Sequence, residues 1–335
     1  MKAVRLYAAG DLRVEDIEAP GVPGEGMVRL TVTAAGICGS DLHNFRTGQW
    51  ISRSPSVAGH EFAGVIDAVG DGVAGLVVGD SVVADSRYWC GTCPACRDGR
   101  RNVCATLGFV GEVCDGGFAE AVELPARLVV RCDAAIDPTV AAMGEPLSVA
   151  LHAIRRLRPE KGRPVLVAGC GPIGGLVAVL LSKLHDGRLL IADRNGERAA
   201  RVAAVTGGDV VGLDKPALEA ALGETALLYA IEATGNIKVV EALADLITPG
   251  GSIALVGISH GKLDFDPNLL VEREIALIGC HAFGDELPEV LEMLPALTPA
   301  LKELIDEVID LDAVPAAYAR LLAGQASGLK TIIRM

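Results

Sequence analysis

The sequence predicts an α/β protein with two domains of different character. The first part of the chain, to about residue 135, consists of short β-type runs separated by glycine-rich turns. From residue 163 onward, short apolar runs alternate with helical stretches, which is the pattern of a parallel sheet wound on both faces. The 335 residues, 50% of them hydrophobic, are enough to form two hydrophobic cores.

The β-rich part begins with a mixed pattern over residues 2–14 that predicts a hairpin. Val28, Leu30 and Val32 then alternate with polar neighbours, as in a strand with one buried face. Short apolar runs continue the β pattern between residues 65 and 83, including the pair Val77 and Val78, with glycine–aspartate turns between them.

The second part contains the alternation in full. A helical stretch over residues 147–157 bridges the two domains. Strands are expected over residues 165–168, 189–192, 209–211, 227–231, 252–256 and 275–278. Helices are expected between them, including residues 176–184, 198–205 and 239–246. An amphipathic helix from Leu287, a stretch over residues 311–328 and a last strand over residues 330–334 complete the chain.

Composition excludes several classes of function. The formal net charge of −13 argues against a nucleic-acid partner or an anionic membrane surface. The N-terminus has no apolar core of a signal peptide, and no apolar run reaches the length of a membrane span. Nine cysteines, an odd number, without a secretion signal favour metal ligands and free thiols over disulfides, and therefore a cytoplasmic location.

The chain is organised around residues 36–43 (GICGSDLH) and 59–61 (GHE). Cys38, His60 and Glu61 supply a thiolate, an imidazole and a carboxylate, which are the three ligand types that zinc accepts from proteins. Three ligands leave one tetrahedral position open, as in a catalytic zinc site. The alternative is a small buried cysteine beside an ordinary turn.

Polar residues around these ligands suggest a reaction. Ser40 and His43 follow Cys38 closely and can pass a proton, and Asp41 could hold the second ring nitrogen of His60. Glu145 precedes a proline and is expected at the start of a helix. Its carboxylate either interacts with the helix dipole or acts at the open zinc position.

A second metal site is predicted from four cysteines with the spacing C-x2-C-x2-C-x7-C. These residues are Cys90, Cys93, Cys96 and Cys104. Four thiolates at such short separations suit one closed tetrahedral zinc, and an iron–sulfur cluster is the competing interpretation. A closed site of this kind would stabilise its lobe rather than carry a reaction.

A glycine-rich turn follows the first strand of the second domain. Its residues are Gly169, Cys170, Gly171, Pro172, Ile173 and Gly174. Between a strand and a helix, such glycines allow a tight turn and the close approach of a pyrophosphate. Asp193 ends the next apolar run, where a carboxylate binds the adenosine ribose and disfavours a 2′-phosphate. NAD is therefore expected rather than NADP, although Arg198 nearby could partly offset this preference; an incidental turn and aspartate are the alternative.

Together these motifs resemble the zinc-containing medium-chain dehydrogenases/reductases of the alcohol dehydrogenase superfamily. The resemblance covers nearly the whole chain and rests on GICGSDLH, GHEFAGVIDAVG, the four-cysteine lobe, EPLSVALHA, VAGCGPIGG and the closing SGLKTII. It implies a GroES-like catalytic domain over residues 1–148, with a structural-zinc lobe over about residues 86–106. A Rossmann NAD-binding domain would follow over residues 149–284, and residues 285–335 would return to the catalytic domain.

The resemblance also implies roles for single residues. Cys38, His60 and Glu61 would hold the catalytic zinc, and Ser40 and His43 would form a proton relay. The four cysteines of the lobe would hold the structural zinc. Asp193 would bind the adenosine ribose, and Lys330 would reach the cofactor pyrophosphate. Glu61 as a ligand, together with Glu145, resembles the polyol and threonine dehydrogenase branch.

The implied activity is the reversible oxidation of a secondary alcohol to a ketone with NAD. The substrate would be a polyol, sugar alcohol, diol or aminoalcohol, in a homodimer or homotetramer. His281-Ala282 replaces the Arg-Tyr pair of sorbitol dehydrogenases, which argues against sorbitol itself. The alternatives are an L-threonine 3-dehydrogenase-like enzyme, a simple alcohol dehydrogenase, a zinc-free quinone reductase and a non-catalytic cofactor-binding sensor.

Overall fold

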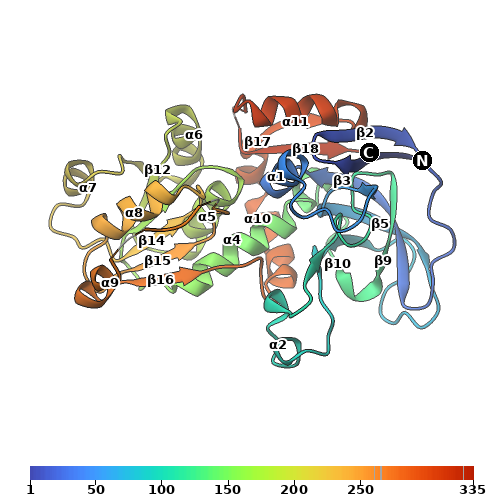
Figure 1. Cartoon of the computed structure of the whole chain (residues 1–335), viewed down its shortest axis with the longest axis horizontal. Helices are drawn as coiled ribbons and strands as arrows, with labels where there is room; N and C mark the ends of the chain where they lie inside the picture. The colour runs from blue at the N-terminus through green and yellow to red at the C-terminus, as the bar shows by residue number, and fades with distance from the viewer. Residues whose placement is uncertain (260, 265, 327) are drawn as a thin grey trace. The chain divides into compact units, whose positions relative to one another are not determined.

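The computed structural model describes the whole chain except residues 260, 265 and 327. Residue 327, the first of the SGLKTII motif, therefore lies outside the described residues. The chain forms two compact units (Figure 1). Unit 1 comprises Met1–Pro146, Gly284–Thr298 and Ile305–Met335, and unit 2 comprises Leu147–Phe283 and Pro299–Leu304. The functional boundaries given above remain a prediction.

Unit 1 begins with the predicted hairpin. β1 (Lys2–Ala8) pairs antiparallel with β2 (Asp11–Asp16), and β4 (Ser56–Val57) pairs with the other edge of β1. The three strands form a small sheet of order β2-β1-β4. Residues of β1 and β4 contribute to the hydrophobic core of the unit.

The main sheet of unit 1 has seven strands, in the order β10-β6-β5-β3-β18-β17 with β9 paired to β3. They are β3 (Met27–Gly36), β5 (Glu61–Val69), β6 (Ser81–Ala84), β9 (Ala121–Pro125), β10 (Val129–Arg131), β17 (Ile305–Ile309) and β18 (Lys330–Arg334). The predicted alternation in β3 is confirmed, since Val28, Leu30 and Val32 are at most 1% exposed. Apolar burial on one face thus fixes the register of the central strand.

The register of β3 brings distant parts of the sequence together. Gly36 is opposite Glu61 in β5 on one side and opposite Ile332 in β18 on the other. The last strand of the chain therefore lies beside the strand that leads into Cys38. This pairing, rather than any local motif, assembles the surroundings of the first candidate metal site.

The other elements of unit 1 are short helices and strands in the connections. They are α1 (Gly39–Thr47), β7 (Arg87–Tyr88), α2 (Pro94–Arg97), η1 (Arg101–Val103), β8 (Gly108–Phe109), η2 (Ala126–Leu128), α3 (Pro138–Ala141), η3 (Leu311–Ala313) and α11 (Val314–Leu322). Two longer helices, α4 (Gly144–Leu157) and α10 (Leu287–Leu304), contribute residues to both units.

One prediction about unit 1 is wrong. Val77 and Val78 do not continue the β pattern: they lie in a turn and are 61% and 62% exposed. The backbone N–H of Val77 donates to the Asp80 carboxylate at 2.9 Å, and Gly79 has φ +96°. The glycine–aspartate pair therefore forms the turn and exposes the two valines.

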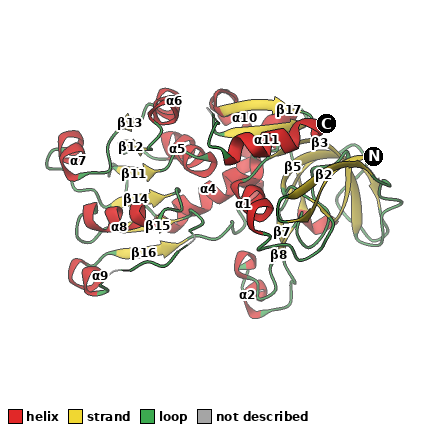
Figure 2. Cartoon of the chain, turned by 45° about the horizontal axis from the view of Figure 1, so that its top comes forward, coloured by secondary structure: helices red, strands yellow, loops and turns green. Residues whose placement is uncertain are grey.

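Unit 2 contains a six-stranded parallel sheet of order β13-β12-β11-β14-β15-β16, which can be followed in Figure 2. The strands are β11 (Val165–Ala168), β12 (Leu189–Ala192), β13 (Asp209–Val210), β14 (Tyr229–Glu232), β15 (Ser252–Leu255) and β16 (Ala276–Gly279). The connecting helices are α5 (Pro172–Leu184), α6 (Gly196–Thr206), α7 (Lys215–Leu222), α8 (Ile237–Leu246) and α9 (Asn268–Arg273). The strands that follow β11 are added first on one side of it and then, from β14 onward, on the other, and open parallel sheets bind ligands at such a switch point.

The central strands of unit 2 are buried on both sides, so they read as continuous apolar runs rather than as alternating ones. All four residues of β11 and all four of β12 are buried. None of the helices in the described part of the chain combines the length and the apolar character that crossing a bilayer requires.

Candidate active site and metal centres

The first metal site is formed where β3, α1 and β5 meet. Cys38 is the N-cap residue of α1, His60 directly precedes β5, and Glu61 is the first residue of β5. One potential ligand atom from each residue lies within 4.8 Å of the other two. A side chain on Gly36 would collide with the Glu61 carboxylate and with Lys330, so glycine is required where these groups pack. A thiolate, an imidazole and a carboxylate at this separation fit one zinc ion.

Asp41 orients the imidazole of His60. One carboxylate oxygen of Asp41 lies 3.4 Å from His60 Nδ1, and the other accepts a hydrogen bond from the Cys38 backbone N–H at 2.8 Å. His60 Nε2 consequently points to Ser40, whose Oγ is 3.4 Å away. The expected support of His60 by Asp41 is thus present, and it leaves Nε2 as the nitrogen for a metal.

The charges of this cluster act on the pKa of His60. Burial alone would lower that pKa, but the negative charges of Asp41 and Cys38 outweigh burial and raise it well above its usual value. An anionic environment that attracts a proton to the ring also attracts a divalent cation, which binds only the deprotonated imidazole.

Lys330 lies against the Glu61 carboxylate. Lys330 Nζ forms an ion pair with Glu61 Oε2, and both side chains are 1% exposed. Burial would lower the pKa of Lys330, yet the charges of Glu61 and Cys38 raise it above its usual value. The ammonium therefore balances a buried negative charge, which would otherwise be costly. The predicted contact of Lys330 with a pyrophosphate stays a prediction.

Glu145 lies in the first turn of α4, as expected, and is 4% exposed. Ser86 Oγ donates a hydrogen bond to its Oε1 at 2.6 Å. Burial raises the pKa of Glu145 to about 7; the charge of His60 lowers it and that of Glu61 raises it. Glu145 is thus close enough to His60 and Glu61 for their charges to act on it, and its role at the open zinc position remains a prediction.

The two residues of the predicted relay are at different distances from the cluster. Ser40 Oγ is beside His60 Nε2, whereas His43 lies one turn further along α1. His43 Nε2 is 2.9 Å from Gln49 Oε1 and 3.2 Å from Thr47 Oγ1. Ser40 is therefore adjacent to the reacting position that a bound metal would create, and the transfer of a proton to His43 stays a prediction.

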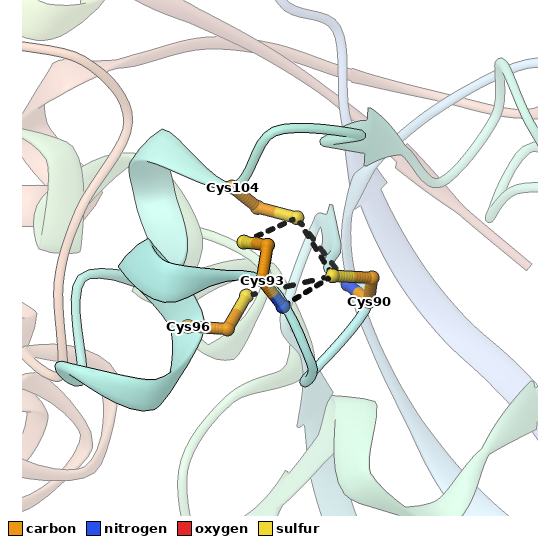
Figure 3. Close-up of side chains that lie close together, drawn as sticks. All are labelled: Cys90, Cys93, Cys96 and Cys104. Carbon is orange, nitrogen blue, oxygen red and sulfur yellow. Dashed lines mark hydrogen bonds between the residues drawn. The ribbon is translucent and has the colours of Figure 1, made fainter.

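The four cysteines of the lobe converge in Figure 3. The sulfur–sulfur distances are 3.5 Å for Cys90 and Cys104, 3.9 Å for Cys93 and Cys104, and 4.0 Å for Cys90 and Cys96. A tetrahedron with zinc–sulfur bonds of about 2.3 Å has edges of about 3.8 Å. An iron–sulfur cluster, the competing interpretation, holds several iron atoms and needs its sulfurs further apart. These distances identify a structural zinc site with four cysteine ligands.

Backbone N–H groups stabilise thiolates in this lobe. Thr92 N–H and Cys93 N–H each donate to Cys90 Sγ at 3.4 Å, and Ala105 N–H donates to Cys93 Sγ at 3.5 Å. The two donors to Cys90 lower its pKa to about 5, whereas burial raises the pKa of Cys96 to about 12. All nine cysteines of the chain are free, so no disulfide competes with metal binding.

The glycine-rich turn of unit 2 has the geometry that its sequence predicts. Gly169 follows β11 with φ +99°, and a Cβ there would lie 2.7 Å from Thr234 Cγ2. Gly171 caps α5, whose first residue is Pro172, and a side chain on Gly174 would collide with the Gly169 carbonyl. The turn is thus tight, and the N-terminus of α5 follows it directly, as in sites that bind phosphate groups.

Asp193 lies directly after β12 and is fixed by two backbone groups. Its oxygens accept hydrogen bonds from Cys170 N–H at 2.6 Å and from Asn195 N–H at 2.7 Å. A carboxylate has about four lone-pair sites, so capacity remains for a ribose. Arg198 is in the first turn of α6, and its charge acts on the pKa of Cys170 in the glycine-rich turn. Cofactor contacts of both residues stay predictions.

Two carboxylates near the candidate sites are missing from the sequence prediction. Glu232 ends β14, is 0% exposed, and accepts hydrogen bonds from Thr234 N–H at 2.7 Å and Gly235 N–H at 3.0 Å. Glu232 thus fixes the loop that packs on Gly169. The sequence pattern that could have indicated Glu232 is its position directly after an apolar run. The second, Glu112, lines a cavity with Ser40 and His60, and no local pattern indicates it.

The fold and the sites define a class of protein: a zinc-containing oxidoreductase with a dinucleotide-binding sheet. The family comparisons agree with this class. Residues 24–134 match the alcohol dehydrogenase GroES-like domain, and residues 173–296 match the zinc-binding dehydrogenase domain. The chain belongs to the zinc-binding medium-chain alcohol dehydrogenase superfamily. The predicted α/β fold, a GroES-like domain plus a Rossmann domain, is confirmed.

Relatives include polyol, threonine and sugar-acid dehydrogenases. L-Galactonate-5-dehydrogenase of Escherichia coli K12 is 34% identical over 264 residues, or 77% of this chain and 76% of the relative. The starvation-sensing protein RspB of the same organism is 30% identical over 99% of both chains. A crystal structure from Escherichia coli CFT073, described as a short chain alcohol dehydrogenase complexed with NADH, has a TM-score of 0.91 and 29% identity, over 100% of this chain and 99% of that chain. This chain is a zinc-dependent NAD(P) dehydrogenase of the polyol/threonine branch.

Proposed function

We propose that the protein oxidises a secondary alcohol of the polyol, sugar alcohol, diol or aminoalcohol type to a ketone, reversibly and with NAD rather than NADP. The observation that carries this proposal is the convergence of Cys38, His60 and Glu61 within 4.8 Å, with Ser40 beside the metal-facing nitrogen of His60. A site with only three protein ligands has room for a substrate oxygen.

Cys38, His60 and Glu61 would hold the zinc ion, which would supply the Lewis acidity that lowers the pKa of an alcohol, with NAD as the hydride acceptor. Ser40 is positioned to accept the hydroxyl proton, and His43 would carry it toward solvent. Asp41 keeps His60 in the orientation that binds a metal through Nε2. Lys330 balances the charge of Glu61, so that a buried carboxylate can stay ionised.

The test is turnover with NAD on the zinc-loaded protein, with a panel of sugar alcohols, diols, aminoalcohols and simple alcohols. Cys38→Ser should reduce kcat/KM by about a thousandfold or more, because it removes a ligand of the open site. Cys132→Ser is the matched control, since Cys132 is also a free, partly exposed cysteine but belongs to neither metal cluster. Full activity in Cys38→Ser would refute the proposal.

A non-catalytic sensor is a second candidate because of the name of the relative RspB. A sensor needs a cofactor site but no residues poised for proton transfer. Here Ser40 is beside His60, which favours an enzyme. If the zinc-loaded protein bound NADH but turned over no alcohol in the panel, the sensor would be the better interpretation.

The proposal includes a homodimer or homotetramer and a cytoplasmic location. β16 ends the strand order of the unit 2 sheet, and its four residues are partly or fully exposed. An exposed apolar edge strand can pair with a second chain. Light scattering at micromolar concentration should therefore give at least twice the mass of one chain.

A further inference from the structure

Glu112 is fixed in the loop between β8 and β9. Its backbone N–H donates to the Phe109 carbonyl at 3.0 Å, and its carbonyl accepts a hydrogen bond from Ser52 Oγ at 2.8 Å. The residue is partly buried and lines one cavity of unit 1 together with Ser40, Asp41 and His60. The backbone thus holds Glu112 on the wall of a cavity that Ser40 and His60 also line.

The carboxylate of Glu112 lacks a hydrogen-bond donor among the residues that the structure describes. Burial raises the pKa of Glu112 to about 7, while the charge of His60 lowers it and that of Asp41 raises it. A carboxylate that is partly withdrawn from water and has no protein donor is less stable in its ionised form. A donor group on a bound ligand would restore the missing hydrogen bond.

The titratable side chains of the cavity lining are two carboxylates, Asp41 and Glu112, and the imidazole of His60. Its lining contains no lysine or arginine among the described residues. The nearest buried cation of the metal cluster, Lys330, is paired with Glu61. Because His60 is neutral when it binds zinc, an anionic group of the substrate beside Glu112 would meet no lysine or arginine on this wall.

We propose that Glu112 determines substrate specificity: it accepts a hydrogen bond from a hydroxyl or ammonium group next to the reacting carbon and rejects a carboxylate or phosphate there. This inference rests on the proposed function and narrows its substrate to neutral polyols, diols and aminoalcohols.

Three alcohols that share the CH3–CHOH centre provide the test: 1,2-propanediol, 1-amino-2-propanol and lactate. The neighbouring group is CH2OH, CH2NH3⁺ or COO⁻, so the set varies only the group that Glu112 would contact. Assays at about pH 8 keep most of the Glu112 carboxyl groups ionised, because their pKa is about 7. The zinc-loaded enzyme with NAD should have a kcat/KM for the diol and the aminoalcohol at least about tenfold above that for lactate.

Glu112→Gln keeps the shape and removes the charge, and it should shrink that ratio by about tenfold. Glu112→Lys should invert it in favour of lactate. Glu120→Gln is the matched control, since Glu120 is exposed, precedes β9 on the same segment and does not line the cavity. It should leave the ratio unchanged. An unchanged ratio in both Glu112 variants, or a wild-type preference for lactate, would overturn the inference.

A binding measurement separates this inference from the proposed function. The Tm of the protein loaded with zinc and NADH should rise with saturating diol or aminoalcohol but not with lactate, and Glu112→Gln should remove the difference. Absent turnover with this selective Tm shift would refute the proposed function and support the role of Glu112. Turnover with equal Tm shifts for all three alcohols would support the function and refute the specificity role.

Discussion

The two metal sites of unit 1 are built in different ways. The structural site takes four identical ligands from one short segment, Cys90 to Cys104, and backbone N–H groups of the same segment point at the sulfurs. The open site takes three different ligands from two segments, and its neighbours Glu145 and Lys330 come from further along the chain. A closed site can thus be encoded locally, whereas an open one depends on tertiary structure.

Because of this difference, the two sites should contribute to the stability of the protein in different ways. The closed site satisfies its own ligands, so its metal chiefly stabilises the lobe. In the open site, the buried charges of Glu61 and Lys330 compensate each other before any metal binds. Changes in the open site should therefore affect the stability of unit 1 even in metal-free protein.

The largest expected effect is that of Lys330→Met. It leaves Glu61 buried and uncompensated, and breaking a buried ion pair on one side costs about 3–5 kcal/mol. The Tm of zinc-stripped protein should fall by about 10 °C. Calorimetry checks this, and the double variant Glu61→Gln/Lys330→Met is the control, because removing both charges should recover most of the loss. Equal Tm values for the two variants would contradict the argument.

Cys96→Ser should have a smaller effect on stability but a clear one on metal content. It leaves three thiolates where a closed site needs four, so zinc should fall by about one ion per chain and the Tm of the zinc-loaded protein by about 5 °C. Metal analysis and calorimetry on the same preparation measure both. Turnover per folded chain should stay near the wild-type value, whereas Cys38→Ser should lose most of its turnover.

The comparison also shows what sequence reasoning can predict. The cysteine lobe, the glycine-rich turn and the strand β3 are set by spacings within a few residues, and the structure confirms each of them. The contact between Asp41 and His60 can also be predicted from the sequence, because Asp41 belongs to the same motif as Cys38.

Contacts between distant segments cannot be predicted from local sequence patterns in this way. Lys330 meets Glu61 because β18 pairs with β3 in one register, and a period-two pattern does not specify which strand is the neighbour. The hydrogen bond between Ser86 and Glu145 and the position of Glu112 on the cavity wall depend on loop conformations. Val77 and Val78 are predicted as β structure because adjacent valines are typical of buried strands. Both side chains are exposed in the structure, so the apolar pattern is misleading there.

Glu145→Gln should change the pH dependence of stability by a smaller amount. Burial raises the pKa of Glu145 from its ordinary value of 4.5 to about 7, so the folded state binds this proton more tightly than the unfolded state. Its stabilising contribution is complete below about pH 4.5 and is lost as the pH rises through 7. Zinc-stripped wild type should therefore lose stability relative to Glu145→Gln over this range, on the order of 2 kcal/mol. Denaturant titrations at pH 4.5, 6 and 8 test this, and a constant difference would show that Glu145 is not protonated in the folded state.

The smallest expected effect lies in unit 2, which carries neither metal cluster. The Asp193 carboxylate is held by Cys170 N–H and Asn195 N–H beside the glycine-rich turn, where an adenosine ribose would bind. Asp193→Ala removes an acceptor for the ribose hydroxyls and a negative charge that would repel a 2′-phosphate. The ratio of kcat/KM for NAD to that for NADP should fall by about tenfold, mainly through weaker use of NAD.

Arg198→Ala is the complementary variant, because loss of its positive charge should raise the same ratio. Both variants should keep the zinc content of the wild type, since cofactor binding and metal binding use separate residues. A wild-type preference for NADP, or an unchanged ratio in Asp193→Ala, would mean that this carboxylate serves the glycine-rich turn rather than the choice of cofactor.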